Sequence, residues 1–185
     1  MAAVTGNVPE LEGDLGVIGP SSRVAAAVPF YPPTDFLQMD AHMIDCAFFN
    51  SQFGLAECHS DPRSPESLLL GCPITTCPDR VAEANPITYV DRDDPPFLVL
   101  HGTNDLLVPH HQSELLLDAL RAACVDATFV SVPGGDHGAW DRWLDGTANA
   151  EGAATVTNGC QARTEPVSPS WDTVIAFLQR TLAMT

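Results

Sequence analysis

The sequence predicts an α/β domain whose sheet holds about three parallel strands flanked by helices. Phe97–Leu100 is a short apolar run bounded by proline and glycine, and Ala127–Val132 is a β-branched run that ends at Pro133-Gly134-Gly135; both predict strands. Between them, apolar residues at helical spacing predict a helix over His111–Ala123. Strand, helix and strand in this order form a right-handed parallel crossover, so both strands should end at the same edge of the sheet.

A third apolar run, Val24–Phe30, ends at Pro32 and Pro33 and predicts another parallel strand. Pro29 lies within this run and cannot donate a hydrogen bond, so it indicates an edge strand or the end of a strand.

The rest of the chain divides into an arm, a helical insertion and a loop. Residues 1–22 are rich in glycine and proline, and we interpret them as an irregular arm of one domain over 23–185. Residues 41–84 contain two typical helix starts, at Ser64-Pro65 and Cys77-Pro78, and should form a helical cap. The run that follows Leu144 and ends at Glu165 is rich in glycine, alanine and threonine and is expected to be a loop.

A last helix is predicted after this loop. Ser168 would cap it, and Pro169 would take its first position. Its apolar residues form one stripe that should pack against the sheet: Trp171, Val174, Ile175, Leu178 and Leu182.

The composition excludes several classes of function. The 185 residues are 45% hydrophobic, which is enough for a buried core. Eight arginines face 24 acidic residues, and the net charge of −16 argues against binding to nucleic acid or to anionic membranes. A solvated acidic surface accounts for this charge, although the acidic loop 91–94 could hold calcium. The sequence contains neither a membrane-spanning stretch nor a signal peptide.

Six cysteines without a C-x-x-C zinc or redox motif favour disulfides, and hence a secreted or periplasmic protein. Cys72 and Cys77 flank a short turn and form the pair that we predict first. The other four would form two pairs: Cys46 with Cys58, and Cys124 with Cys160. Sequence alone does not fix this connectivity, and Cys124 could instead be a free buried thiol.

Chemically capable side chains follow both strands of the central crossover. Asp105 lies in the turn after the first strand, and His137 lies in the turn after the second. Ligands gather at the carboxyl ends of parallel strands, and a buried carboxylate can hold an imidazole in one tautomer and stabilise its protonated form. Asp105 and His137 are therefore the candidate acid and base of a catalytic site.

The motif HGTNDLLVP, followed by a helix, a strand and GGDHG, resembles the acid and histidine segments of α/β-hydrolases. The similarity is to the secreted carboxylesterase, feruloyl esterase and polyester depolymerase-like group. It implies that Asp105 is the triad acid, that His137 is the triad base, and that the fold is a truncated α/β-hydrolase lacking the nucleophile half. The missing half would leave Val24–Phe30 as an open apolar edge, which invites pairing with another chain. The resemblance therefore predicts a homodimer, formed by pairing of Val24–Phe30 across a two-fold axis or by exchange of the N-terminal arm. By the same resemblance, Asp35 would be structural or line the site. Trp140 would either pack over the core or bind an aromatic acyl group of the substrate.

The sequence contains no G-x-S-x-G pentapeptide and no HGGG-type oxyanion loop. We therefore consider three hypotheses. In the first, the protein hydrolyses carboxylic ester or lactone bonds, with His137 activating water or a non-standard serine and with no cofactor. In the second, it is a catalytically silent hydrolase or a binding module. In the third, acidic residues hold calcium for a metal-assisted hydrolase.

Overall fold

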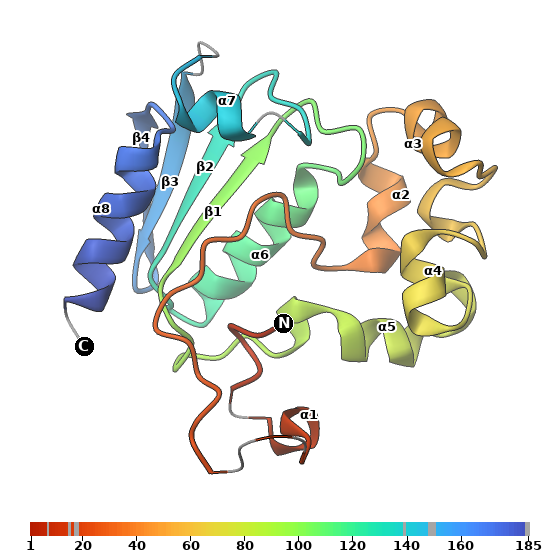
Figure 1. The fold of residues 1–185 in the computed structure, drawn as a ribbon, viewed down its shortest axis with the longest axis horizontal. Helices are drawn as coiled ribbons and strands as arrows, with labels where there is room; N and C mark the ends of the chain where they lie inside the picture. Colours follow the sequence, from red (N-terminus) through yellow and green to blue (C-terminus); the bar gives the residue numbers. More distant parts are fainter. Residues whose placement is uncertain (7, 15, 17–18, 139, 148–150, 184–185) are drawn as a thin grey trace.

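The structure is a computed structural model that describes residues 1–183 apart from 7, 15, 17–18, 139 and 148–150, with the backbone alone at Trp140 and Asp141. Its centre is a four-stranded sheet with the order β1 (Phe97–Gly102), β2 (Ala127–Val132), β3 (Gly152–Asn158) and β4 (Gln161–Val167). β1 and β2 are parallel, whereas β3 is antiparallel to both β2 and β4 (Figure 1). The α/β class is confirmed, but the sheet is mixed rather than a parallel sheet of about three strands.

The hairpin of β3 and β4 occupies the run that we expected to be a loop. β4 is exposed along almost its whole length, so no alternation of apolar residues marks it in the sequence. In β3, the Thr157 hydroxyl accepts a hydrogen bond from the Ala127 amide at 2.7 Å and donates to the Val125 carbonyl at 3.0 Å. Polar contacts help to attach this hairpin, and the hydrophobic pattern of the sequence does not reveal them.

The predicted strand at Val24–Phe30 is reduced to two isolated parallel bridges beside β1, from Ala27 to Phe97 and from Phe30 to Leu100. The segment bonds to β1 through the Tyr31 amide and the Ala27 and Pro29 carbonyls, and its Ala27 amide donates to the Pro96 carbonyl just before the strand. Pro29 has no N–H group to add to this ladder, which explains why no continuous strand forms. The segment nevertheless lies next to β1, as expected.

Helices cover both faces of the sheet (Figure 1). α6 (His111–Ala122) joins β1 to β2 and packs Leu116, Leu117 and Leu120 on one face. α8 (Trp171–Leu182) packs on the other face through Val174 and Phe177. Because β1 lies between these two layers, all six of its residues are buried.

The start and the packing face of α8 differ from the prediction. Its cap is Ser170, whose side chain accepts from the Thr173 amide, so the helix begins two residues after the expected first position at Pro169. Trp171, Ile175 and Leu182 are 41%, 48% and 53% exposed. Val174 is buried and Leu178 packs against the core, as predicted, and the buried residues also include Phe177 and Thr181, which the prediction omitted. Two apolar stripes lie side by side on this helix, and only one of them reaches the sheet.

Short helices fill residues 36–88 and form a layer beside the sheet (Figure 1). In chain order they are η1 (Phe36–Gln38), α2 (Met39–His42), α3 (Cys46–Phe53), η2 (Cys58–Ser60), α4 (Pro65–Leu70), η3 (Ile74–Thr76), α5 (Pro78–Ala84) and η4 (Pro86–Thr88). We refer to residues 36–88 as the cap. Two further short helices are α1 (Pro9–Glu12), in the N-terminal segment, and α7 (Trp140–Leu144) after the β2 turn. No helix in the described part of the chain has the length and apolarity needed to cross a bilayer.

All six cysteines form disulfides in the predicted pairs: Cys46–Cys58, Cys72–Cys77 and Cys124–Cys160. Two of the bonds lie within the cap. The third joins the turn between α6 and β2 to the turn between β3 and β4. The bonds therefore stabilise short helices with little core of their own and an exposed hairpin.

Candidate functional site

The turns that follow β1 and β2 are joined by backbone hydrogen bonds. The Thr103 amide donates to the Val132 carbonyl, and the Asn104 amide donates to the Gly135 carbonyl, both at 2.9 Å. Gly102 and Gly135 pack so closely that a Cβ on Gly102 would lie 2.1 Å from the Gly135 carbonyl oxygen. Because glycine allows this approach, Asp105 and His137 are brought to the same edge of the sheet.

His137 and Asp105 form a direct hydrogen bond. His137 Nδ1 lies 2.8 Å from Asp105 Oδ2. The Asp105 side chain is fully buried, whereas the His137 side chain is 29% exposed. The two residues singled out in the sequence therefore meet as a buried carboxylate and a solvent-accessible imidazole, the arrangement of an acid–base pair.

The carboxylate of Asp105 accepts hydrogen bonds on both oxygens. Oδ1 accepts the amides of Leu107 and Val108 at 2.8 Å each, and Oδ2 lies 3.2 Å from His101 Nε2 as well as beside His137. Burial raises the pKa of Asp105, but hydrogen bonds from His101, His137 and the Val108 amide outweigh it and hold the pKa well below its usual range. Asp105 is therefore ionised at neutral pH and can stabilise a positive charge on His137.

The two ring nitrogens of His137 have different surroundings. Nδ1 faces the carboxylate and carries a proton, so Nε2 holds the lone pair in the neutral ring. Within the described part of the chain, no residue forms a hydrogen bond with Nε2. His137 is therefore oriented to accept a proton at Nε2.

Tyr31 packs against the face of the His137 imidazole, with ring centroids 3.9 Å apart and a tilt of 39°. Its φ of 38° lies in the left-handed region, which is unfavourable for a bulky side chain and costs about 1–3 kcal/mol. The contact of Tyr31 with the imidazole is not predictable from the sequence. Strained residues are typical of functional sites, and only the backbone conformation reveals this one.

No contact among the described residues joins Asp35 to Asp105 or His137. The Asp35 carboxylate accepts hydrogen bonds from the Leu37 amide, Gln38 Nε2 and Asn85 Nδ2 at 3.1, 2.7 and 3.1 Å. These contacts fix the start of the cap and correspond to the structural role. Trp140 begins α7, and its side chain lies outside the described residues.

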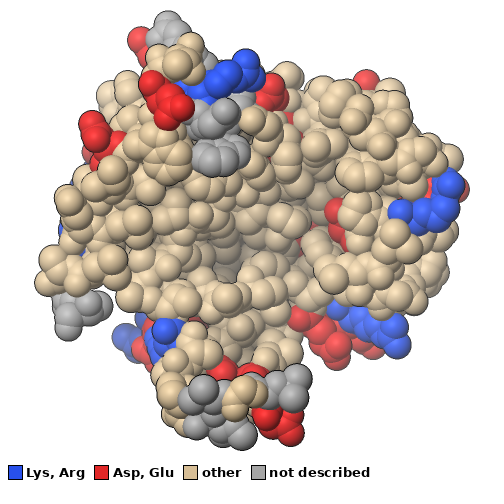
Figure 2. Space-filling view, in the orientation of Figure 1, with Lys and Arg blue, Asp and Glu red and all other residues tan. Residues whose placement is uncertain are grey.

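One face of the molecule is hollowed between the sheet and the cap (Figure 2). Asp, Glu and Arg side chains gather mainly around its margins, and mostly uncharged residues line the hollow itself. Although the chain carries a net charge of −16, the hollow is therefore suited to a neutral ligand better than to an ion.

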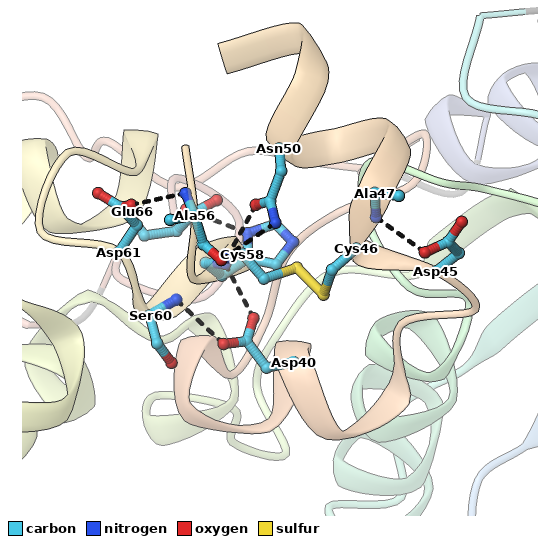
Figure 3. The surroundings of a disulfide bond; sticks show 11 residues. Asp40, Asp45, Cys46, Ala47, Asn50, Ala56, Cys58, Ser60, Asp61 and Glu66 are labelled. Carbon is cyan, nitrogen blue, oxygen red and sulfur yellow. Dashed lines mark hydrogen bonds and ion pairs between the residues drawn. A yellow bond between two sulfur atoms is a disulfide. The ribbon is translucent and has the colours of Figure 1, made fainter. Parts of the chain in front are cut away.

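One group of side chains in the cap brings potential metal ligands together: Asp40, Cys46 and Cys58. The two sulfur atoms form a disulfide and cannot act as thiolates, and Asp40 accepts the amides of His59 and Ser60 at 2.9 and 3.0 Å (Figure 3). The group therefore stabilises the turn at η2 and does not fit a metal.

The acidic loop at residues 91–94 also closes on itself. Asp91 Oδ1 accepts the Asp93 amide at 2.7 Å, and Asp94 Oδ2 accepts the Asp91 amide at 3.0 Å. Burial, followed by the nearby charge of Asp91, raises the pKa of Asp94, although the hydrogen bond from the Asp91 amide opposes this. The carboxylates of Asp91 and Asp94 bind backbone amides of their own turn, and a cation would have to compete with these amides.

The BD-FAE family model matches residues 1–120, which include Asp105. Among curated proteins, the chain is 34% identical over 121 residues to a probable carboxylic ester hydrolase, LipM, of Mycobacterium tuberculosis (strain ATCC 25618 / H37Rv). That match covers 65% of the chain but only 24% of the relative. The chain therefore spans about a quarter of the length of this relative.

Two solved structures are similar at 35% sequence identity. One is described as a truncated form of a carbohydrate esterase from gut microbiota, with a TM-score of 0.58 over 74% of this chain and 47% of that one. The other is a bifunctional GH43-CE protein of Bacteroides eggerthii, with a TM-score of 0.60 over 74% and 19% of the two chains. Both similarities support the α/β-hydrolase-like architecture.

Proposed function

Because the chain belongs to the BD-FAE family, we propose that it hydrolyses carboxylic ester bonds with Asp105 and His137 as its acid–base pair. The single observation that carries this proposal is the 2.8 Å hydrogen bond between His137 Nδ1 and the buried Asp105. The name of LipM, a probable carboxylic ester hydrolase, and the description of a similar structure as a carbohydrate esterase support the same reaction class. Lactones, as cyclic esters, belong to the proposed substrates.

In this proposal, His137 acts twice. Its Nε2 first takes a proton from a hydroxyl nucleophile as that nucleophile attacks the ester carbonyl, and the ionised Asp105 stabilises the resulting imidazolium. The imidazolium then returns the proton to the leaving alcohol. Water as the nucleophile gives the carboxylic acid directly, whereas a serine is left acylated and a second round, with water attacking the acyl group and the proton returned to the serine, releases the acid. Asp105 holds the ring in the required tautomer throughout and keeps its own charge.

The 185 residues do not contain the G-x-S-x-G pattern. The nucleophile in this proposal is therefore water or a serine outside such a pattern. A second copy of the chain could supply such a serine. The segment Val24–Phe30 could pair with a second copy, because the Ala27 and Tyr31 amides point to Pro96 and Leu100, whereas no described residue bonds to the amides of Ala26 and Val28. We propose a homodimer through this edge, which light scattering at micromolar concentration tests; a single monomeric species contradicts it.

Hydrolysis of aryl esters and lactones tests the catalytic proposal. Substitution His137→Ala should lower kcat by at least about 10²-fold, because the general base is lost. Asp105→Asn should lower it similarly, because the ring loses its orientation and its compensating charge. The exposed His42 provides the matched control, and His42→Ala should retain the full rate. An equal rate in His137→Ala and in the unmodified protein would refute the proposal.

The absence of the nucleophile pentapeptide favours a second candidate, a catalytically silent hydrolase or binding module. This candidate predicts no saturable hydrolysis that depends on His137. A calcium-assisted hydrolase ranks lower, since the acidic turn at 91–94 satisfies its own carboxylates. That mechanism predicts that exhaustive chelation removes activity, whereas the acid–base mechanism predicts no change.

Two further proposals concern substrate contacts and location. We retain Asp35 and Trp140 as proposed substrate-binding residues; Asp35→Ala and Trp140→Ala should then raise KM with little effect on kcat. Three disulfides support a secreted or periplasmic location. Alkylation of free thiols in freshly lysed cells should then label none of the cysteines.

A further inference from the structure

His101 is a buried imidazole close to the same oxygen of the Asp105 carboxylate as His137. It belongs to β1, and its side chain is fully buried. Its Nε2 lies 3.0 Å from the Val108 carbonyl oxygen and 3.2 Å from Asp105 Oδ2, and its Nδ1 lies 2.7 Å from Ser113 Oγ in α6. The same carboxylate oxygen therefore faces two imidazoles, one buried and one accessible to solvent.

The partners of His101 determine where its proton lies. Nε2 faces two acceptors, a carbonyl and a carboxylate, and so must carry a hydrogen. Nδ1 faces a hydroxyl that is itself buried, and this hydroxyl can donate to Nδ1 when the ring is neutral. A neutral ring protonated on Nε2 accepts from Ser113 and shares its one N–H between the Val108 carbonyl and Asp105 Oδ2. Two further rings lie near it, His110 at 5.4 Å and Tyr31 at 6.3 Å between centroids.

We infer that His101, fixed in this tautomer by Ser113, is a positioning residue that shares Asp105 Oδ2 with His137 and thereby moderates the basicity of His137. An N–H group donated to Oδ2 draws negative charge away from the imidazolium that forms on His137. Removing this donor leaves more of the charge to His137, whose ring should then bind a proton at higher pH. The inference rests on the proposed acid–base pair but is measured without substrate.

The unmodified protein provides the first test, by ¹⁵N NMR of the histidine rings at pH 8. His101 should show a protonated Nε2 and an unprotonated Nδ1. A ring protonated on Nδ1 would overturn the inference. This measurement requires no substitution and therefore does not depend on the folding of a variant.

Variants provide the second test, by following the His137 ring through a pH titration. In His101→Leu the midpoint of the His137 titration should rise by about one pH unit, because one hydrogen bond to the carboxylate is lost. In His101→Gln the side-chain amide can still donate to Asp105, so the midpoint should return close to its original value. Ser113→Ala removes only one hydroxyl and should raise the midpoint in the same direction by less.

His59 gives the matched control. It is also fully buried, but it lies in the cap with its ring 3.9 Å from that of Phe49. His59→Leu should cost stability and leave the His137 midpoint unchanged. If His101→Leu and Ser113→Ala also leave it unchanged in folded protein, His101 only fills space and the inference is wrong.

The inference and the proposed function fail separately. If the His137 midpoint responds to His101 while no ester is hydrolysed, the positioning role stands and the proposed activity is wrong. If hydrolysis depends on His137 but the midpoint of the His137 titration is the same in the His101 variants, the activity stands and the positioning role is wrong.

Discussion

Substitution Gly102→Ala tests whether close packing of two glycines positions the acid–base pair. A Cβ on Gly102 would lie 2.1 Å from the Gly135 carbonyl oxygen and 2.3 Å from its carbonyl carbon, whereas ordinary contact begins at 3.4 Å. Both atoms belong to the backbone, so no side-chain rotation relieves the overlap. The turns after β1 and β2 would have to separate by more than about 1 Å.

This separation should destabilise the protein by about 3 kcal/mol. Overpacking of a core costs about 1–3 kcal/mol, and the hydrogen bond from the Asn104 amide to the Gly135 carbonyl contributes about 1 kcal/mol more. For a domain of this size, each kcal/mol lowers the unfolding temperature by about 2–4 °C. We therefore expect a decrease of about 9 °C.

Thermal unfolding followed by circular dichroism, with the disulfides intact, measures this effect. Gly138→Ala is the matched control, because a Cβ at that position meets nothing within 4 Å. The control should unfold within about 1 °C of the unmodified protein. Equal unfolding temperatures for Gly102→Ala and Gly138→Ala would show that the two turns are not packed as described.

Three further predictions concern stability in urea. Because the φ of Tyr31 is positive, the variant Tyr31→Gly should be more stable than Tyr31→Ala by about 1 kcal/mol. If Tyr31→Ala is the more stable of the two, the backbone is not strained at this residue. Burial, and then the nearby His101, lower the pKa of His110. The unfolded chain therefore binds more protons below about pH 6.5, so stability should fall between pH 7 and 5; parallel curves for His110→Gln and the unmodified protein would contradict this. Replacing Cys124 and Cys160 by serine opens a loop with a sequence separation of 36 and should cost about 4 kcal/mol; a loss below about 1 kcal/mol would contradict it.

The crossover could be predicted from the sequence because its signals are strong and local. Ala127–Val132 is an apolar run followed by proline and glycine, and the structure places β2 at the same residues. β4 gives no such signal, since its residues are exposed and its place is set by pairing with β3. On α8, the sequence shows two neighbouring apolar stripes but not which of them faces the sheet.

The candidate site is predictable to a similar extent. Asp105 and His137 follow parallel strands, so their proximity follows from the topology alone. The second donor to the carboxylate, His101, lies within the quoted motif, but its role depends on the hydroxyl of Ser113 in a different element. The backbone strain at Tyr31 depends on a φ angle that no residue pattern encodes.

The disulfide between Cys124 and Cys160 affects how the sheet can open. It joins the turn between α6 and β2 to the tip of the β3–β4 hairpin, so the most exposed strand is covalently attached at that end. Fluctuations that expose β4 amides to solvent must then begin at the opposite end, near Gly152 and Val167, and proceed toward the tip. In the oxidised protein, hydrogen exchange should therefore be slowest beside the crosslink, and reduction should reverse this gradient along the hairpin.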